Sequence, residues 1–144
     1  MSHRIPVSQD TARDPLARMR AYQLAVELRG ESWPDIDELR HQPAMLKTAE
    51  QLYAAIGSIS ARLAEGYSRS SGRDRARIFE YALGSTRESM EWYQSGSPVL
   101  GKEITIARLD KLEEIRRLLL ATIPRERERL IRPRKPRLES EQKS

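Results

Sequence analysis

The sequence contains no cysteine, only two histidines and no long hydrophobic run. Without cysteine it has neither a disulfide framework nor a thiolate zinc site. His3 and His41 lie too far apart in the sequence to suggest a metal centre. No apolar run approaches the roughly 20 residues that a helix needs to span a bilayer, and residues 1–15 lack the apolar region of a signal peptide. We therefore expect a cytoplasmic protein with no metal, no cofactor and no membrane partner.

Sustained alternation of polar and apolar residues is also missing, so the sequence predicts no β-strand. Instead, four amphipathic segments follow one another with short connections between them. This pattern predicts an all-α protein, an antiparallel up-down-up-down four-helix bundle. We divide the chain of 144 residues into a disordered N-terminal segment (1–13), the four-helix bundle (14–123) and a basic, largely disordered C-terminal tail (124–144).

Glycine and proline set the expected ends of the first two helices. The first begins at Asp14 and is stopped by Gly30 and Pro34, which leaves residues 32–43 as a connector. The second is expected to end at Gly66, in the left-handed conformation that closes many helices. Its apolar residues recur at spacings of four and three, as in bundle helices: Met45, Ala49, Leu52, Ile56, Ile59 and Leu63.

The third and fourth helices have similar signals. Ser71 is expected to cap the third helix, and the loop at residues 95–101 is expected to end it. The fourth helix begins near Gly101 or Lys102, and its packing pattern ends at Pro124. The side chains that it is predicted to turn inward are Ile106, Leu109, Leu112, Ile115, Leu119 and Ile123.

The formal net charge of +5 is concentrated near the C-terminus. Residues 125–137 carry six arginines and one lysine against two glutamates, so the rest of the chain is close to neutral. A basic end on a neutral body is typical of a protein with a phosphate-rich partner, or of a solvated disordered tail. This stretch has no aromatic residue, so base stacking is not indicated there. Its candidate nucleic-acid-binding residues are Arg125, Arg127, Arg129, Arg132, Arg134, Lys135 and Arg137.

A second basic cluster lies around the predicted start of the third helix. Cations are unfavourable at a helix N-terminus, so helix stability does not explain why arginines gather there. They either bind phosphate or form ion pairs with Glu65, Asp74 or Glu80, and the sequence leaves both interpretations open. Glu65 itself lies at the unfavourable end of the second helix, and we predict that nearby arginines such as Arg62 offset this. The cluster consists of Arg69, Arg73, Arg75 and Arg77.

Catalytic groups are scarce. Neither histidine lies near a serine that it would activate. The acidic residues and His41 of the first connector match no calcium loop and no metal-binding histidine pair. We therefore expect no enzyme activity. The aromatic residues Trp33, Trp92 and Tyr93 are expected in the core or at an interface.

Two linked motifs carry a family resemblance. One is Ala64-Glu65-Gly66, followed by Arg69 and Ser71, and the other is Ala82-Leu83-Gly84-Ser85, followed by Glu88. Together with AYQLAVEL in the first helix, they resemble the four-helix-bundle family whose founding members are encoded within 23S rRNA intervening sequences. In that family Glu65, Gly66, Ser71, Gly84, Ser85 and Glu88 would have structural roles. Gly84 is costly in a helix, so we expect a close helix contact there.

The resemblance implies a ring, commonly a homopentamer, without enzyme chemistry. A related branch is the accessory variability determinant of diversity-generating retroelements, a basic pentamer that partners a reverse transcriptase and binds nucleic acid. We therefore expect a non-catalytic oligomeric bundle that binds RNA or DNA through its basic patches. The alternative is a protein-interaction adaptor or accessory subunit, with a reverse transcriptase as a candidate partner.

Overall fold

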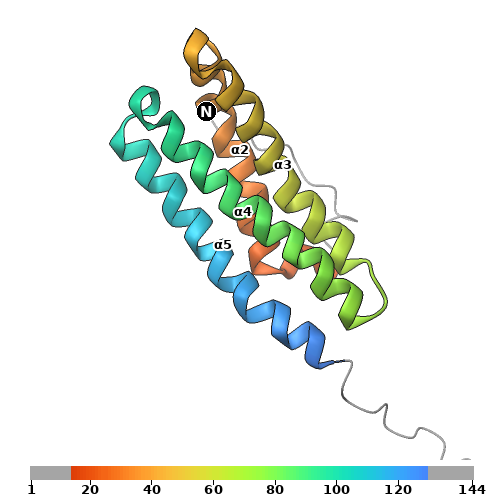
Figure 1. Ribbon diagram of the computed structural model, residues 1–144. Helices are drawn as coiled ribbons and strands as arrows, with labels where there is room; N and C mark the ends of the chain where they lie inside the picture. The colour runs from red at the N-terminus through yellow and green to blue at the C-terminus, as the bar shows by residue number, and fades with distance from the viewer. Residues whose placement is uncertain (1–13, 130–144) are drawn as a thin grey trace, which may run out of the picture.

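The computed structural model describes residues 14–129, and within them the chain forms four long α-helices (Figure 1). They are α2 (Arg20–Arg40), α3 (Leu46–Tyr67), α4 (Gly72–Leu100) and α5 (Lys102–Glu128), with two short 3-10 turns, η1 (Pro15–Arg18) and η2 (Pro43–Met45). These residues form no β-strand, which confirms the predicted all-α class. None of their helices has the length and apolar character needed to cross a membrane. The disorder predicted for residues 1–13 and for the tail beyond Arg129 lies outside the described residues.

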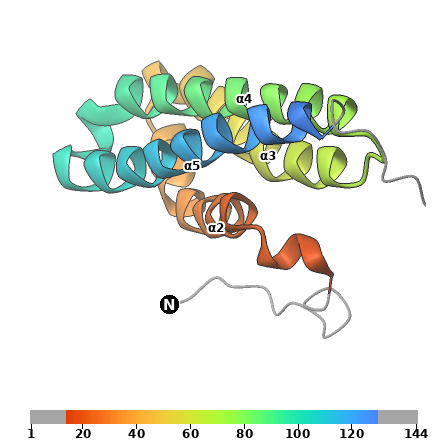
Figure 2. The same ribbon diagram turned by 90° about the horizontal axis from the view of Figure 1, so that it is seen from below.

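Helices that follow one another in the sequence pack side by side. The most extensive contacts join α3 to α4 and α4 to α5, while α2 packs on α3 and, over a smaller surface, on α5. In Figure 1 the chain reverses direction between these helices, and Figure 2 shows α2 lying against the layer that the other three form. Short connections require neighbouring helices to run antiparallel, so the arrangement agrees with the predicted four-helix bundle.

The apolar side of α3 lies at the centre of the core. The side chains that its spacing predicted to be inside are buried, except that Met45 is only half-buried: Ala49, Leu52, Ile56, Ile59 and Leu63. Phe79 and Tyr93 of α4 and Leu112 of α5 are fully buried against the same cluster. One inward prediction was wrong, because Ile106 is 46% exposed and Thr105 is buried in its place. Thr105 lies seven residues before Leu112, two helical turns along the same side of α5.

The predicted helix stop at Gly30 and Pro34 was wrong, because α2 continues through both residues to Arg40. Proline inside a helix costs about 3 kcal/mol. The second half of α2 nevertheless buries Ile36 and Leu39 in the core, and burial of each such side chain contributes about 1.5–3 kcal/mol. Pro34 itself is exposed, so its ring takes no room in the core. The burial of Ile36 and Leu39 therefore outweighs the tendency of Gly30 and Pro34 to end the helix.

The loop predicted at residues 95–101 is helical as far as Leu100. Gly96 explains why this stretch belongs to the bundle: a Cβ there would lie 2.9 Å from Cδ2 of Leu39, so α4 passes close to α2. The helix ends at Gly101, which has a φ of 88° and is the only described residue with positive φ. With its ψ of 159°, Gly101 has a backbone conformation that essentially only glycine adopts, so this residue can end the helix.

The last helix also passes through a proline. α5 continues through Pro124 to Glu128, beyond the boundary at residue 124 that the sequence suggested between bundle and tail. Ile123 and Glu126 on either side of Pro124 are buried, whereas Pro124 is exposed. The first turns of the basic stretch are therefore part of the bundle.

Gly66 does not close α3 in a left-handed conformation, so that prediction was wrong. The helix includes Gly66 and Tyr67, and Ser68 follows with ordinary right-handed φ and ψ of −78° and −11°. A Cβ at Gly66 would lie 2.7 Å from Cε1 of Phe79. Glycine is therefore required for the close approach of α3 and α4, rather than for a turn.

A buried carboxylate joins three helices. Asp35 of α2 accepts hydrogen bonds at Oδ2 from the Tyr93 hydroxyl of α4 (2.7 Å) and from Nε of Arg108 of α5 (2.8 Å). The Asp35 side chain is only 6% exposed. Burial raises the pKa of Tyr93, and the neighbouring Asp35 charge raises it further. Asp35, one of the acidic residues of the predicted first connector, therefore takes part in the packing of α2 against α4 and α5.

Further ion pairs extend this contact along α2 and α5. Arg108 also donates from Nη1 to Oε2 of Glu31 (3.0 Å), and Lys111 pairs with both Glu31 and Glu27. Glu27, Glu31 and Asp35 are four residues apart, so they lie on one side of α2. Opposite charges thus hold α2 against α5 where their contact is smaller than the other contacts between neighbouring helices.

We predict that Gly66→Ala lowers the free energy of unfolding by about 1–3 kcal/mol, because the added methyl group overpacks the contact with Phe79. Gly84→Ala is the matched control, since a Cβ there meets no atom within 4 Å. It should raise the free energy of unfolding by about 0.5–1 kcal/mol through helix propensity. Urea denaturation measures both values, and a stabilised Gly66→Ala variant would contradict the close approach.

We also predict that Asp35→Ala lowers the free energy of unfolding by about 3–5 kcal/mol, because it leaves Arg108 without its buried partner. Asp37→Ala is the control: Asp37 pairs with Arg40 at 2.8 Å, but both side chains are about half exposed. Its cost should stay below about 1 kcal/mol. Thermal or urea unfolding compares the two, and equal losses would show that the buried network adds nothing to the packing of α2.

Candidate nucleic-acid interface

The start of α4 and the end of α5 meet at one end of the bundle. Ser71 caps α4, as predicted, by accepting a hydrogen bond from the Asp74 amide (3.1 Å). The next residue, Gly72, packs so closely on α5 that a Cβ there would collide with the carbonyl oxygen of Glu126. The two basic clusters, far apart in sequence, are thereby brought together. We call this end the basic pole, which carries Arg69, Arg73, Arg75, Arg77, Arg125, Arg127 and Arg129.

Arg75 holds the two helices together at the pole. Its Nε donates to Oε2 of Glu126 (3.1 Å) and its Nη1 to the carbonyl oxygen of Tyr67 (2.8 Å). The guanidinium also lies over the Tyr67 ring, 4.6 Å from its centroid. The side chains of Arg75 and Glu126 are 17% and 11% exposed. Arg75 is therefore a structural residue, and its charge is already balanced.

Glu65 is anchored by two arginines, which confirms the predicted ion pairs. Arg62 donates from Nη1 to Oε2 of Glu65 (3.0 Å), and Arg69 donates from Nη2 to Oε1 (3.3 Å). The hydrogen bond from Arg62 is the largest cause of a lowered pKa at Glu65, and burial acts in the opposite direction. The two cations offset the unfavourable position of Glu65 in the last turn of α3.

The remaining arginines of the pole fall into two groups. Arg127 pairs with Glu80 of α4, and Arg129 pairs with Glu126 at 3.1 Å. Arg73, Arg77 and Arg125 are exposed and make no ion pair with any described residue. Within the pole, these three cations are therefore available to phosphate. The other predicted residues of the tail, Arg132, Arg134, Lys135 and Arg137, lie outside the described residues.

The second family motif lies away from the pole, between α3 and α4. Ser85 donates to the hydroxyl of Ser58 across the two helices (2.9 Å), and Glu88 accepts from the Trp92 indole (3.3 Å). Gly84 is exposed, and a Cβ there would meet nothing within 4 Å, so the predicted close helix contact at Gly84 was wrong. Within the chain, Ser85 rather than Gly84 joins α3 to α4.

Glu126 is the residue of this site that the sequence analysis missed. It was counted only as a counter-charge in the basic tail, although its burial and its two arginine partners organise the pole. A signal existed in its position three residues after Ile123, on the inward side of a helix that continues through Pro124. Within residues 14–129, no group of three or more histidine, aspartate or glutamate side chains is placed to hold a metal ion.

Comparison with known proteins gives one match. Residues 17–121 match the family described as 23S rRNA-intervening sequence protein. No curated protein shows significant similarity to the chain, and no solved structure does either. The matched residues cover all of α2, α3 and α4 and most of α5. They include Arg69, Arg73 and Arg77 but end before Arg125, so the pole combines residues inside and outside the family region.

We predict that the Glu65 carboxyl titrates below its ordinary pKa and that Arg62→Gln raises this pKa, because it removes the strongest hydrogen bond. Arg117→Gln, on α5, is a control that should leave it unchanged. Since the folded pKa is the lower one, these ion pairs stabilise the fold above the unfolded pKa and lose their effect as the pH falls through the folded value. Carbon-13 NMR of the carboxyl group follows the titration, and an identical pKa in wild type and Arg62→Gln would contradict the anchor.

Proposed function

The chain belongs to the 23S rRNA-intervening sequence protein family, and on this premise we propose that it is a non-catalytic, oligomeric bundle that binds RNA or DNA through the basic pole. The observation that carries the proposal is that the helix ends bearing Arg73, Arg77 and Arg125 meet at the pole, where these three exposed cations form no ion pair with a described residue. Each is free to neutralise a phosphate and release its counterions.

Helix stability does not account for two of these cations. Arg73 and Arg77 lie in the first two turns of α4, where the helix dipole disfavours positive charge. Arg125 lies in the last turn of α5, where the dipole favours it. Cations at an unfavourable place that form no ion pair with a described carboxylate support an external anion, and a phosphate backbone supplies such anions at regular spacing.

The proposed oligomer is the homopentamer that the family resemblance implies. A ring repeats the basic pole once per subunit, so several modest phosphate contacts act together on one nucleic acid. Binding would then be sequence-tolerant and strongly dependent on salt, since backbone contacts carry no base information.

A second candidate function is that of an adaptor or accessory subunit, with a reverse transcriptase as the candidate class of partner. Exposed apolar side chains on the outer sides of α4 and α5 favour it: Tyr81 is 53%, Ile106 46% and Leu120 43% exposed. Such side chains are more common in protein interfaces than on free surfaces. Removing residues 130–144 separates the two candidates. The truncation leaves the pole intact, so nucleic-acid binding through the pole should persist. Loss of nucleic-acid binding with a protein partner that still copurifies would favour the adaptor.

We predict that the triple variant Arg73→Ala, Arg77→Ala, Arg125→Ala binds a structured RNA about 10- to 100-fold more weakly than wild type at low salt. The slope of log K against log salt concentration should become shallower by about 2–3, because about one counterion is released per phosphate contact. Fluorescence anisotropy across a salt series measures both quantities.

The matched control is Lys47→Ala, Lys102→Ala, Arg117→Ala, which removes the same charge from exposed positions away from the pole. It should retain most of the affinity, with a smaller change in slope. Equal losses in both triple variants would show that net charge, rather than the pole, determines binding. A wild-type protein whose affinity does not change with salt would contradict the proposed function itself.

A further inference from the structure

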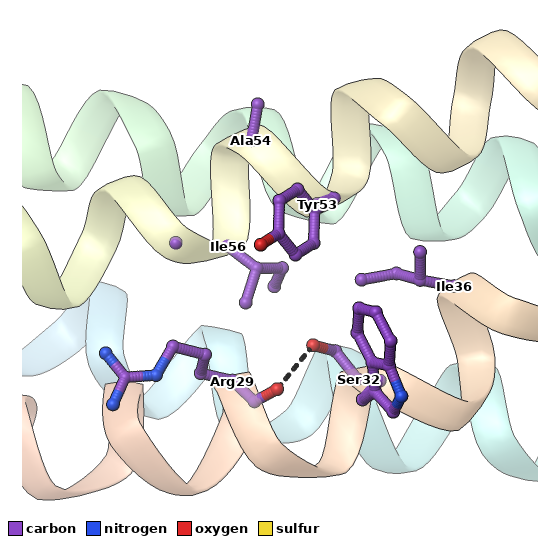
Figure 3. Close-up of a pocket in the computed structure, with 8 residues that line it drawn as sticks. Arg29, Ser32, Ile36, Tyr53, Ala54 and Ile56 are labelled. Atoms are coloured by element: carbon purple, nitrogen blue, oxygen red, sulfur yellow. Dashed lines mark hydrogen bonds between the residues drawn. The ribbon is translucent and has the colours of Figure 1, made fainter.

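An apolar groove runs between the outer sides of α2 and α3, away from the pole. It has a volume of about 360 Å³ and is lined by Arg29, Ser32, Trp33, Ile36, Tyr53, Ala54, Ile56 and Gly57. Figure 3 shows Tyr53 and Ile56 reaching from α3 toward α2, with Ile36 and Arg29 on the α2 side of the same space. The groove exists because α2 continues past Gly30, which brings Trp33 and Ile36 opposite α3.

Two large aromatic rings at this groove are exposed to solvent. Trp33 is 53% and Tyr53 is 60% exposed, and their ring centroids lie 6.1 Å apart with an interplanar angle of 64°. This edge-to-face pairing leaves aromatic surface uncovered. Such rings bury large areas when they pack in a core or bind a partner, so the pair is suited to stacking with a planar group from outside the chain.

A cation and an open backbone position adjoin the rings. Arg29 donates from Nη1 to the Ser60 hydroxyl (3.1 Å) and forms no ion pair with a described carboxylate. Its positive charge is therefore available to an anion. Gly57, inside α3, costs about 1 kcal/mol relative to alanine, yet a Cβ there would meet nothing within 4 Å. Because Gly57 has no side chain, the α3 side of the groove is open at this position.

We propose that the groove binds an unpaired base of single-stranded nucleic acid, with the base on Trp33 and Tyr53 and its phosphate beside Arg29. This inference rests on the proposed function and adds a preference for single strands to it. A volume of about 360 Å³ lies near the lower end of small-ligand pockets, so it suits a planar ring system better than a helix from a partner. The charge of Arg29 complements the phosphate that every base carries with it.

The groove and the pole lie along the same helix. Ser60, which holds Arg29, is seven residues after Tyr53 on α3, about 10 Å closer to the pole. Tyr53 and Tyr67, which lies under Arg75 at the pole, are about 20 Å apart along the helix. A few nucleotides of single strand span such a distance. One strand can therefore contact the pole through its phosphates and place a base in the groove.

Trp33 fluorescence tests this inference. The chain has two tryptophans, so a Trp92→Phe protein reports on Trp33 alone. We expect a single-stranded oligothymidylate to quench this fluorescence with saturation, and a DNA duplex of equal length to bind with little quenching. Tyr53→Ala or Arg29→Ala, each in this background, should weaken oligothymidylate binding by about tenfold and duplex binding much less, as expected for the loss of one stacked base or one phosphate contact.

Tyr81→Ala is the matched control, because Tyr81 is also a half-exposed tyrosine but lies on α4 beneath Arg62. It should leave oligothymidylate binding unchanged. Duplex binding without Trp33 quenching would overturn the groove inference and leave the proposed function standing. Failure of both ligands to bind would overturn both. Sedimentation of Trp33→Ala and Tyr53→Ala provides a further check: a fall in oligomer mass would identify the groove as a subunit contact and overturn the inference.

Discussion

The contact between Arg75 and Glu126 determines where the basic residues of this protein lie. Glu126 is buried in the last turn of α5, and Arg75 reaches it from the first turn of α4 while also holding the end of α3 through the Tyr67 carbonyl. Gly72 permits the close approach. Three helix ends are therefore fixed at one point. Because α5 ends there, the arginines around residues 73–77 and those around residues 125–129 lie at the same end of the bundle.

Many charged side chains of the bundle form ion pairs with one another, which distinguishes them from the cations of the pole that pair with no described carboxylate. Asp35, Arg108 and the neighbouring acidic residues of α2 neutralise one another between α2 and α5. Such networks contribute little net stability compared with apolar packing, but losing one partner is costly. Glu65 neutralises arginines at the end of α3 in a similar way. At the pole, by contrast, Arg73, Arg77 and Arg125 form no ion pair with a described carboxylate.

Much of the fold could be predicted from the sequence, because the apolar spacing along α3 follows the helical period so closely that Ala49 to Leu63 could only face one core. Rules for single residues were less reliable. Pro34 and Pro98 lie inside helices, and Gly66 serves a close approach to Phe79 rather than a turn. Burial of many side chains outweighs one unfavourable residue, and a local pattern contains no information on which distant residue will approach. For the same reason the sequence did not reveal the role of Glu126, because its partner Arg75 is 51 residues away. The pairing of Glu65 was predictable because its partners lie within one turn.

Hydrogen–deuterium exchange, compared with and without a structured RNA, tests the central claim most directly, because it locates the contact without altering the protein. Amides that are exposed at the pole exchange quickly unless a ligand covers them. The account predicts slower exchange in the connection between α3 and α4, at residues 68–73, and in the last turn of α5, with little change at the opposite end around Leu100 and Lys102. Bound RNA that leaves the pole unprotected, or protects the opposite end instead, would contradict it.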